Sequence, residues 1–282
     1  MRRPEEIKDQ LGNIEQIETV VVAMRALAAA HSSEARRHLT AIREYEATVA
    51  GALGAALALF PDPDALAGAG KVEGRLAIVV GASQGFSGAY SERLVAAALS
   101  YAESADVAFM LIGQRCISEF AAHGRQPIWS AEMVSHCAEV PALASRINDA
   151  LFAQLDGGEI GRVSIIFADP GPPSTTIVER GLMPLESLKL TRAREVGIPL
   201  ITLAPQVLST GLVAEYVFST ICEGLILGFA AENYARMEAM SRARGNVRLI
   251  REDLRSEFAQ SRQEQTTTEI VELSEAVTQI GD

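Results

Sequence analysis

The chain has 282 residues, a net charge of −11 and a hydrophobic content of 48%, which is enough for one large core or two smaller ones. Its acidity argues against a nucleic-acid binder, because phosphate recognition requires a basic surface. Three widely spaced cysteines favour buried thiols in a reducing compartment over a disulfide framework. We expect no signal peptide, because residues 4–10 are charged where an apolar core would be needed. We expect no membrane span, since the longest apolar run, Leu212 to Ala231, is interrupted by Glu215 and Glu223.

A long N-terminal helix is predicted over residues 5–60, which contain no proline and place apolar residues three and four positions apart. As one helix this tract would extend roughly 80 Å, so it needs a partner along its length. The expected core stripe comprises Ile7, Leu11, Ile14, Ile17, Val21, Met24, Ala28, His31, Ala35, Leu39, Ile42, Tyr45, Val49 and Leu53.

The middle of the chain, residues 72–205, alternates strand-like and helix-like runs, which predicts a small α/β domain with a mainly parallel sheet. A Pro- and Gly-containing segment at 61–70 predicts the boundary before it. Residues 175–185 are expected to add an edge strand. The other expected strands are 75–80, 105–113 and 161–169, and the expected helices are 91–104, 114–124 and 143–155.

A second proline-free tract, residues 206–282, predicts the partner helix. The segment Ser261 to Thr268 continues the helical spacing in polar form, as expected of a surface that meets water or another protein. The predicted fold class is therefore α/β: an antiparallel coiled coil (1–60 and 206–282) with an inserted Rossmann-like domain (72–205). The expected stripe here comprises Val213, Val217, Ile221, Leu225, Gly228, Ala231, Met237, Met240, Arg244, Val247, Ile250, Leu254 and Phe258.

The glycine-containing loop GASQGFSG, residues 81–88, is the strongest candidate for a cofactor site. It is similar to the dinucleotide-binding loop of short-chain dehydrogenases, but its third glycine is displaced by one position. That family also needs a Tyr-x-x-x-Lys pair, and none of the five tyrosines has a lysine four residues later. We interpret the loop as a tight strand-to-helix corner and expect no bound cofactor, with an adventitious anion site as the alternative.

Two further patterns leave alternatives open. His31 and His38 lie seven residues apart, and we expect a solvated or packed pair, with no metal site. Seven arginines of the second tract are interleaved with glutamates, which fits either a solvated helix face or a basic collar for an acidic partner. These arginines are Arg236, Arg242, Arg244, Arg248, Arg251, Arg255 and Arg262.

The segment ENYARMEAMSRARGN, residues 232–246, resembles the E-x-x-A-R-M-x-A-M-x-x-A-x-x-N signature of the γ subunits of F-type ATP synthases. RQEQTTTEIVEL, residues 262–273, resembles a second motif of that family, and the glycine loop retains Gly85 and Gly88 of a third. A fourth similarity, near the N-terminus, rests on Ile14, Ile17, Ala23, Met24, Ala28, Ala29, Ala30 and Arg37.

Departures from the family pattern concentrate in the glycine loop. Ser83, Phe86, Ser87 and Ser91 stand where the family usually has Asp, Leu, Cys and Asn. The first helix is acidic where the family is typically lysine-rich. These differences suggest a divergent γ, and we hypothesise that it belongs to an alternative, second-copy (N-type) ATPase.

The resemblance implies a non-catalytic rotor shaft that couples ion flow through the membrane sector to ATP synthesis or hydrolysis at α/β interfaces. The implied partners are the α and β subunits of an α3β3 ring, the ε subunit and the membrane c-ring. The implied location is the cytoplasmic face of the bacterial inner membrane, peripheral through the Fo sector. Alternatives are a coiled-coil scaffold with an inserted α/β domain and, more remotely, a dehydrogenase-like oxidoreductase. The residues expected to make packing or bearing contacts are Met24, Arg236, Met237, Met240, Arg244 and Asn246.

Overall fold

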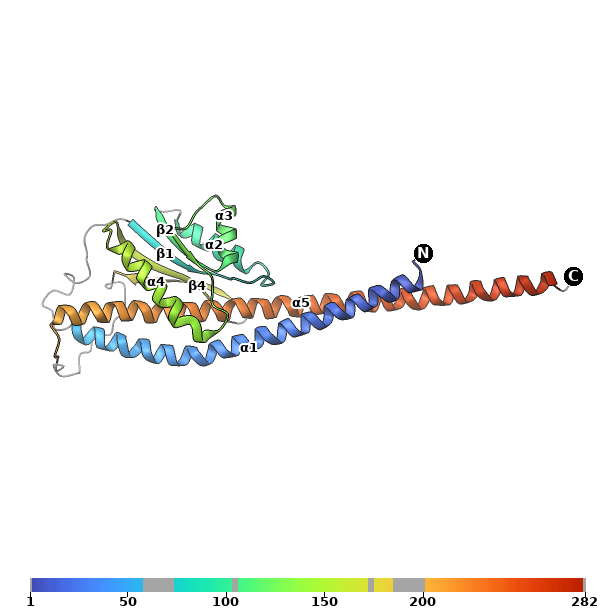
Figure 1. Ribbon diagram of the computed structural model, residues 1–282, viewed down its shortest axis with the longest axis horizontal. Coiled ribbons are helices and arrows are strands. Elements are labelled where there is room, and N and C mark those ends of the chain that lie inside the picture. The colour runs from blue at the N-terminus through green and yellow to red at the C-terminus, as the bar shows by residue number, and fades with distance from the viewer. Residues whose placement is uncertain (1, 58–73, 103–105, 172–174, 185–200, 281–282) are drawn as a thin grey trace. The chain divides into compact units, whose positions relative to one another are not determined.

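The computed structural model describes residues 2–57, 74–102, 106–171, 175–184 and 201–280. Two helices, α1 (Pro4–Leu57) and α5 (Pro205–Ile280), flank the sheet-forming segment in the sequence (Figure 1). The predicted boundary segment 61–70 lies outside the described residues. The chain forms two compact units, one comprising Ala28–Arg236 and the other Met1–Leu27 with Met237–Asp282.

The larger unit contains a five-stranded sheet in the order β3-β2-β1-β4-β5. Strands β3, β2, β1 and β4 are parallel, and β5 pairs antiparallel with β4 at the edge, which confirms the predicted edge strand. The short strand β3 was not predicted from the sequence, because three residues are too few to show a distinguishable alternation of apolar side chains. The elements are β1 (Gly74–Val80), α2 (Tyr90–Ala102), β2 (Val107–Ile112), α3 (Gln114–Ala122), β3 (Trp129–Ala131), η2 (Cys137–Glu139), α4 (Val140–Leu155), β4 (Ile160–Asp169) and β5 (Thr176–Met183).

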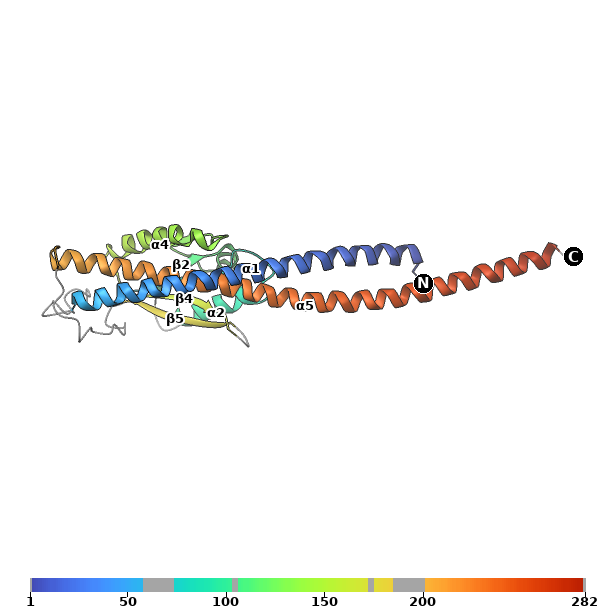
Figure 2. The same ribbon diagram turned by 90° about the horizontal axis from the view of Figure 1, so that it is seen from below.

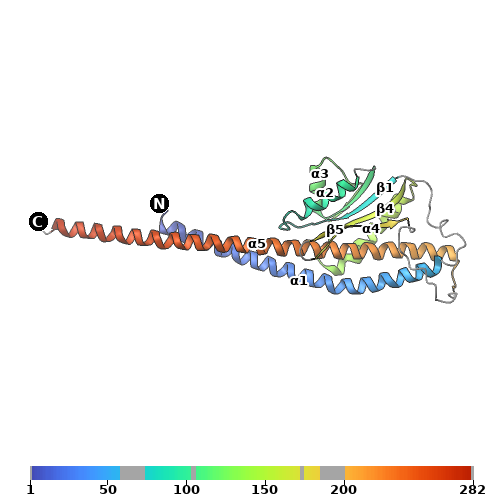
Figure 3. The ribbon, with the colours of Figure 1, turned by 180° about the vertical axis from the view of Figure 1, so that it is seen from behind.

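Both faces of the sheet are buried, as the continuous apolar runs of β1 and β4 require. Alternate residues of β1 face opposite ways: Ile78 and Val80 pack with α4 and the first part of α5, whereas Ala77 and Val79 pack with α2 and α3. Helices α2 and α3 accordingly lie on the side of the sheet away from α5 (Figures 1 and 3). Helix α5 is therefore a core element of this unit.

Two glycines set how closely α5 approaches the sheet. A Cβ built on Gly228 would lie 2.4 Å from Val80 Cγ1, and one built on Gly224 would lie 2.6 Å from Ile165 Cδ1. Both distances are far below van der Waals contact. The two glycines are four residues apart on one face of the helix, so together they allow its backbone to lie directly on β1 and β4.

Gly228→Ala is expected to lower the free energy of unfolding by about 1–3 kcal/mol, because the stiff Val80 side chain leaves no room for a methyl group. Gly245→Ala on the same helix is the matched control, since a Cβ there meets nothing within 4 Å. It should raise stability by roughly 0.5–1 kcal/mol through its higher helix propensity. Urea denaturation of both variants measures the difference. Equal effects of the two substitutions would show that the close approach at Gly228 does not constrain the fold.

Within the larger unit, α1 runs antiparallel to the first part of α5 (Figure 2). Val49 and Leu53 pack with Tyr216 in a separate small cluster, and Ala35 belongs to the main core. The smaller unit shows the same antiparallel order, because Glu18 pairs with Arg251 and Arg2 pairs with Glu257. The predicted fold class, an antiparallel helix pair with an inserted α/β domain, is confirmed.

The predicted apolar stripes were wrong at several positions. Ile17 and Ile250 are 48% and 47% exposed, and Tyr45 is 41% exposed. At each of these places the next residue turns inward, and it is polar: Glu18, Arg251 and Glu46. On a straight helix, positions seven residues apart are rotated by about 20° relative to each other. Over several turns this rotation moves the predicted apolar residue out of the interface and moves its polar neighbour in, so ion pairs form at these positions. Arg244, also assigned to the stripe, is exposed.

Helix α5 contains an 18-residue window with a mean hydropathy of 1.6, which makes it long and apolar enough to cross a bilayer by length and composition. The expectation that two glutamates would exclude such a window was therefore too strict. However, 72% of the window is buried inside the protein. Its apolarity is accounted for by its place against the sheet, because a helix covered by other elements carries apolar residues all round.

Candidate functional site

The glycine loop lies at the carboxyl end of β1, between β2 and β4. In an open parallel sheet this switch point is where nucleotides bind. Here the loop binds to its own chain. The backbone N–H of Gln84 donates to Glu232 Oε1 of α5 at 3.1 Å, and the N–H of Gly81 donates to Ile112 O at 2.9 Å. A carboxylate of the protein thus accepts a backbone hydrogen bond that a phosphate would otherwise take.

Two of the three glycines in the loop have separate structural reasons. A Cβ on Gly81 would lie 2.3 Å from Cys116 Cβ, so α3 could not approach the end of β1. Gly88 has a φ of 61°, a backbone conformation that residues other than glycine rarely adopt. Phe86 has a φ of 64° and its ring is 67% exposed. The interpretation of the loop as a close-packed corner accounts for Gly81 and Gly88.

Arg236 fixes the loop to α5. Its guanidinium pairs with Glu232 at 2.5 Å, donates to Asn233 Oδ1 at 2.9 Å and donates to Gly85 O at 3.2 Å. The side chains of Arg236 and Glu232 are only 8% and 5% exposed. Two residues of the predicted signature are therefore structural in this chain: one carboxylate holds the loop N–H, and one guanidinium holds the loop carbonyl.

Ser83, one of the departures from the family pattern, is also engaged. Its hydroxyl oxygen accepts from the backbone N–H of Met133 at 2.8 Å and from that of Gln114 at 3.4 Å. A serine oxygen in place of the usual aspartate thus ties the loop to α3 and to the segment after β3. The serine at this position, although it departs from the family pattern, therefore still accepts hydrogen bonds that hold the loop in place.

A buried ion network joins three elements of the larger unit. Arg180 of β5 pairs with Glu223 of α5 at 2.5 Å and also with Glu46 of α1. Arg43 of α1 donates to the second oxygen of Glu223 at 2.7 Å. The glutamate side chains are 7% and 11% exposed. The apolar spacing of the sequence did not predict this network. The available signal was Glu223 within an otherwise apolar run, because an acid in such a position is retained only when it is paired.

The pKa values of the two glutamates are shifted in opposite directions. Burial raises the pKa of Glu46 above its ordinary value, and Arg180 only partly offsets this. Burial acts in the same sense on Glu223, but hydrogen bonds from Arg43 and Glu46 and the charge of Arg180 outweigh it. The pKa of Glu223 is therefore lowered, which means that the network favours its ionised form.

The remaining residues expected to make packing or bearing contacts lie in the smaller unit. Met240 is buried, Met24 and Met237 are partly buried, and Arg244 and Asn246 are exposed. The burial of the first three is compatible with the predicted packing contacts. The predicted bearing contacts of Arg244 and Asn246 remain a prediction.

The arginine series of α5 is mostly neutralised within the chain. Arg251 pairs with Glu18, Arg255 pairs with Glu15 at 3.8 Å, and Arg248 pairs with Glu252 at 3.3 Å. Glutamates of α1 therefore supply part of the acidic surface that the basic-collar interpretation assigned to a partner. The pairs involving Arg248 and Arg255 are well exposed and contribute little stability each.

A cavity of about 290 Å³ lies beside the glycine loop. Polar side chains dominate its lining, including His31, Ser83, Glu132, Ser135 and Arg236. His31 was expected to pair with His38. In the structure it lies instead next to His136, with ring centroids 6.0 Å apart, while His38 is exposed.

Comparison with known proteins gives consistent matches over nearly the whole chain. A family model described as ATP synthase matches residues 3–278. The ATP synthase gamma chain of Persephonella marina is 24% identical over 285 residues, with 97% of each chain covered. That of Moorella thermoacetica is 23% identical over 280 residues, again with 97% of each covered.

Solved structures show the same fold at lower identity. A chain of the Euglena gracilis mitochondrial ATP synthase rotor aligns with a TM-score of 0.64 at 14% identity, covering 93% of this chain and 98% of that one. A chain of the Tetrahymena thermophila central stalk and c-ring structure aligns with a TM-score of 0.56 at 14% identity, covering 79% and 99%.

Proposed function

The chain belongs to the ATP synthase γ family, and on that basis we propose that it carries torque between a membrane c-ring and an α3β3 ring. As a γ chain it is a non-catalytic, central-stalk subunit of a rotary ATP synthase. It is peripheral to the membrane as part of that membrane-associated complex. ATP synthesis and hydrolysis take place on other subunits.

The free end of α5 carries the proposal. Ser261 donates to the carbonyl of Arg2 at 3.1 Å, so residues 262–280 continue the helix beyond the start of α1. Ile270 and Leu273 in this extension are 62% and 67% exposed. A single helix with exposed apolar side chains is only marginally stable in water, which supports the idea that other protein subunits surround it. We propose that these subunits are those of the α3β3 ring.

We also propose a role for each other part of the chain. Residues 1–60 and 206–282 would form the shaft, and residues 72–205 would form a base that contacts the ε subunit and the c-ring. Met24, Arg236, Met237 and Met240 would stiffen the shaft by packing. Arg244 and Asn246, which are exposed, would contact the ring.

The proposal also covers the cellular location of the complex and the type of ATPase to which it belongs. We place the complex at the cytoplasmic face of a bacterial inner membrane, which is supported by the bacterial gamma chains among its relatives. The altered residues in the loop, Ser83 and Phe86, and Ser91 just after it support an alternative rather than a housekeeping ATPase. A gene neighbourhood with a complete standard subunit set, in which this chain is the only γ, would contradict the subtype.

Affinity purification of the tagged chain from its native host tests the function. We expect the α, β and ε subunits and, in mild detergent, the c-ring to co-purify in fixed ratio. Truncation after residue 261 removes the free end of α5 and should weaken retention of α and β, while ε should remain bound through the base. Recovery of the full-length chain alone would support the scaffold alternative instead.

A further inference from the structure

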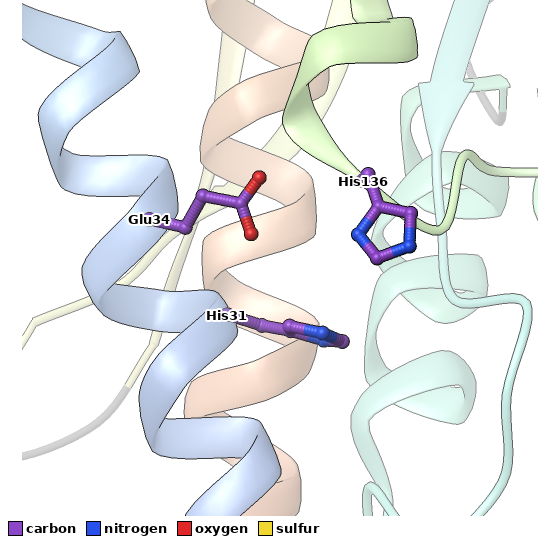
Figure 4. Close-up of side chains that lie close together, drawn as sticks. All are labelled: His31, Glu34 and His136. Carbon is purple, nitrogen blue, oxygen red and sulfur yellow. The ribbon is translucent and has the colours of Figure 1, made fainter.

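Three metal-ligating side chains from distant parts of the sequence meet in the larger unit. His31 and Glu34 lie three residues apart on α1 and therefore share one face of the helix. His136 comes from the segment between β3 and η2. One ligand atom from each of the three lies within 4.8 Å of the others. Figure 4 shows both rings and the carboxylate directed into the same space.

Neighbouring groups hold two of these side chains in place. The backbone N–H of Cys137 donates to Glu34 Oε1 at 3.3 Å, which orients the carboxylate; its second oxygen has no hydrogen-bond donor among the residues that the structure describes. The ring of His31 packs against buried Phe229, with centroids 5.6 Å apart. Supporting contacts of this kind position metal ligands in proteins and tune their affinity. His136 is exposed and can turn toward the other two.

We propose that His31, Glu34 and His136 bind a divalent transition-metal ion of the Zn²⁺ class. Two imidazole nitrogens with one carboxylate oxygen suit Zn²⁺ and its neighbours, whereas Mg²⁺ and Ca²⁺ prefer oxygen ligands alone. Metal–ligand bonds of about 2.0–2.2 Å require the three atoms to close by roughly 1–1.5 Å, which side-chain rotation at exposed His136 can supply. The cavity of about 290 Å³ beside His31 leaves space for a water molecule as a further ligand.

Such an ion would have a defined structural consequence. It would add a bond between the helical segment of α1 and the connection that precedes α4, which the Cys137–Glu34 hydrogen bond and the contact of the two rings already join at this point. Occupancy would therefore raise the stability of the larger unit, because a ligand that binds only the folded state stabilises it by mass action.

Metal titration of the full-length chain tests the site. After chelator treatment and dialysis, Zn²⁺ is titrated calorimetrically, and Co²⁺ is used to report coordination by its visible absorption. We expect one equivalent to bind with micromolar or tighter affinity and to raise the melting temperature. His31→Ala and His136→Ala should each weaken binding by more than about 100-fold, since loss of a supporting contact alone costs about 10–100-fold.

The remaining two histidines provide the matched control. The double variant His38→Ala/His123→Ala removes as many imidazoles from exposed positions and should bind Zn²⁺ like the unmodified chain. Glu34→Gln can keep the acceptor for Cys137 but loses the charge, so its affinity should fall while its metal-free melting temperature stays constant. The proposal fails if the unmodified chain binds no Zn²⁺ at 100-fold molar excess, or if binding survives the loss of both His31 and His136.

Discussion

Met240→Pro is expected to abolish ATP-driven ion pumping while leaving substantial ATP hydrolysis. Met240 lies inside α5 and is 5% exposed. Proline there removes the hydrogen bond to Arg236, four residues earlier, and clashes with its carbonyl, at a cost of about 3 kcal/mol or more. A shaft broken at this point cannot transmit rotation, although nucleotide sites on other subunits remain. The measurement compares hydrolysis rate with ion uptake in membrane vesicles that contain the assembled complex.

Met240→Leu is the control for this experiment. A change that conserves volume and helix propensity costs less than about 1.5 kcal/mol, so pumping per ATP hydrolysed should be preserved. Assembly is checked by the amounts of α and β retained on the membranes. An assembled Met240→Pro complex that pumps ions with unchanged stoichiometry would exclude a continuous α5 as the element that transmits torque.

Glu223→Gln is expected to lower the free energy of unfolding by about 3 kcal/mol. Removal of one partner of a buried ion pair costs about 3–5 kcal/mol, and the lower end applies because Arg180 retains Glu46 and is 32% exposed. Glu252→Gln, which breaks an exposed pair on the same helix, should cost less than about 0.5 kcal/mol. Urea denaturation near neutral pH measures both. Similar losses for the two variants would contradict a stabilising role for the buried network.

The pH dependence should separate Glu223 from Glu46. Because the folded-state pKa of Glu223 is lowered, its stabilisation is present above pH 4.5, its ordinary value, and is lost as the pH falls through the folded value. The folded-state pKa of Glu46 is raised, so its contribution is complete below pH 4.5 and is lost as the pH rises through the folded value.

The stability difference between the unmodified chain and Glu223→Gln should therefore shrink toward acid pH. The difference for Glu46→Gln should shrink in the other direction, as the pH rises above 4.5. Parallel pH profiles for the two variants would indicate that the network titrates as one group, without the division assigned here.

The sequence predicted well what depends on local chemistry. Proline clashes with a helix wherever it occurs, so two long tracts without proline indicated α1 and α5, and the structure has helices at Pro4–Leu57 and Pro205–Ile280. Strands β1, β2 and β4 are buried on both faces and appear as continuous apolar runs. The missing tyrosine–lysine pair argues against a dehydrogenase from the sequence alone.

Contacts between distant segments could not be predicted in the same way. Whether Tyr45 or Glu46 faces inward depends on a helix rotation of about 100°, which the apolar spacing alone leaves open over a helix of this length. The pairing of Glu223 with Arg180 depends on the register of β5 against β4. The meeting of His31 with His136 depends on how α1 packs beside the segment before η2.

The sequence by itself determined that this protein is a pair of long helices around an α/β domain, and its motifs placed it among γ subunits. Only the tertiary structure decided which charges are buried, why Glu232 and Arg236 hold the glycine loop, and which histidines converge. The physical reason is the sequence separation between the interacting residues. Helix and strand formation depend on neighbours along the chain, whereas these side-chain partners are set by packing between elements far apart in sequence.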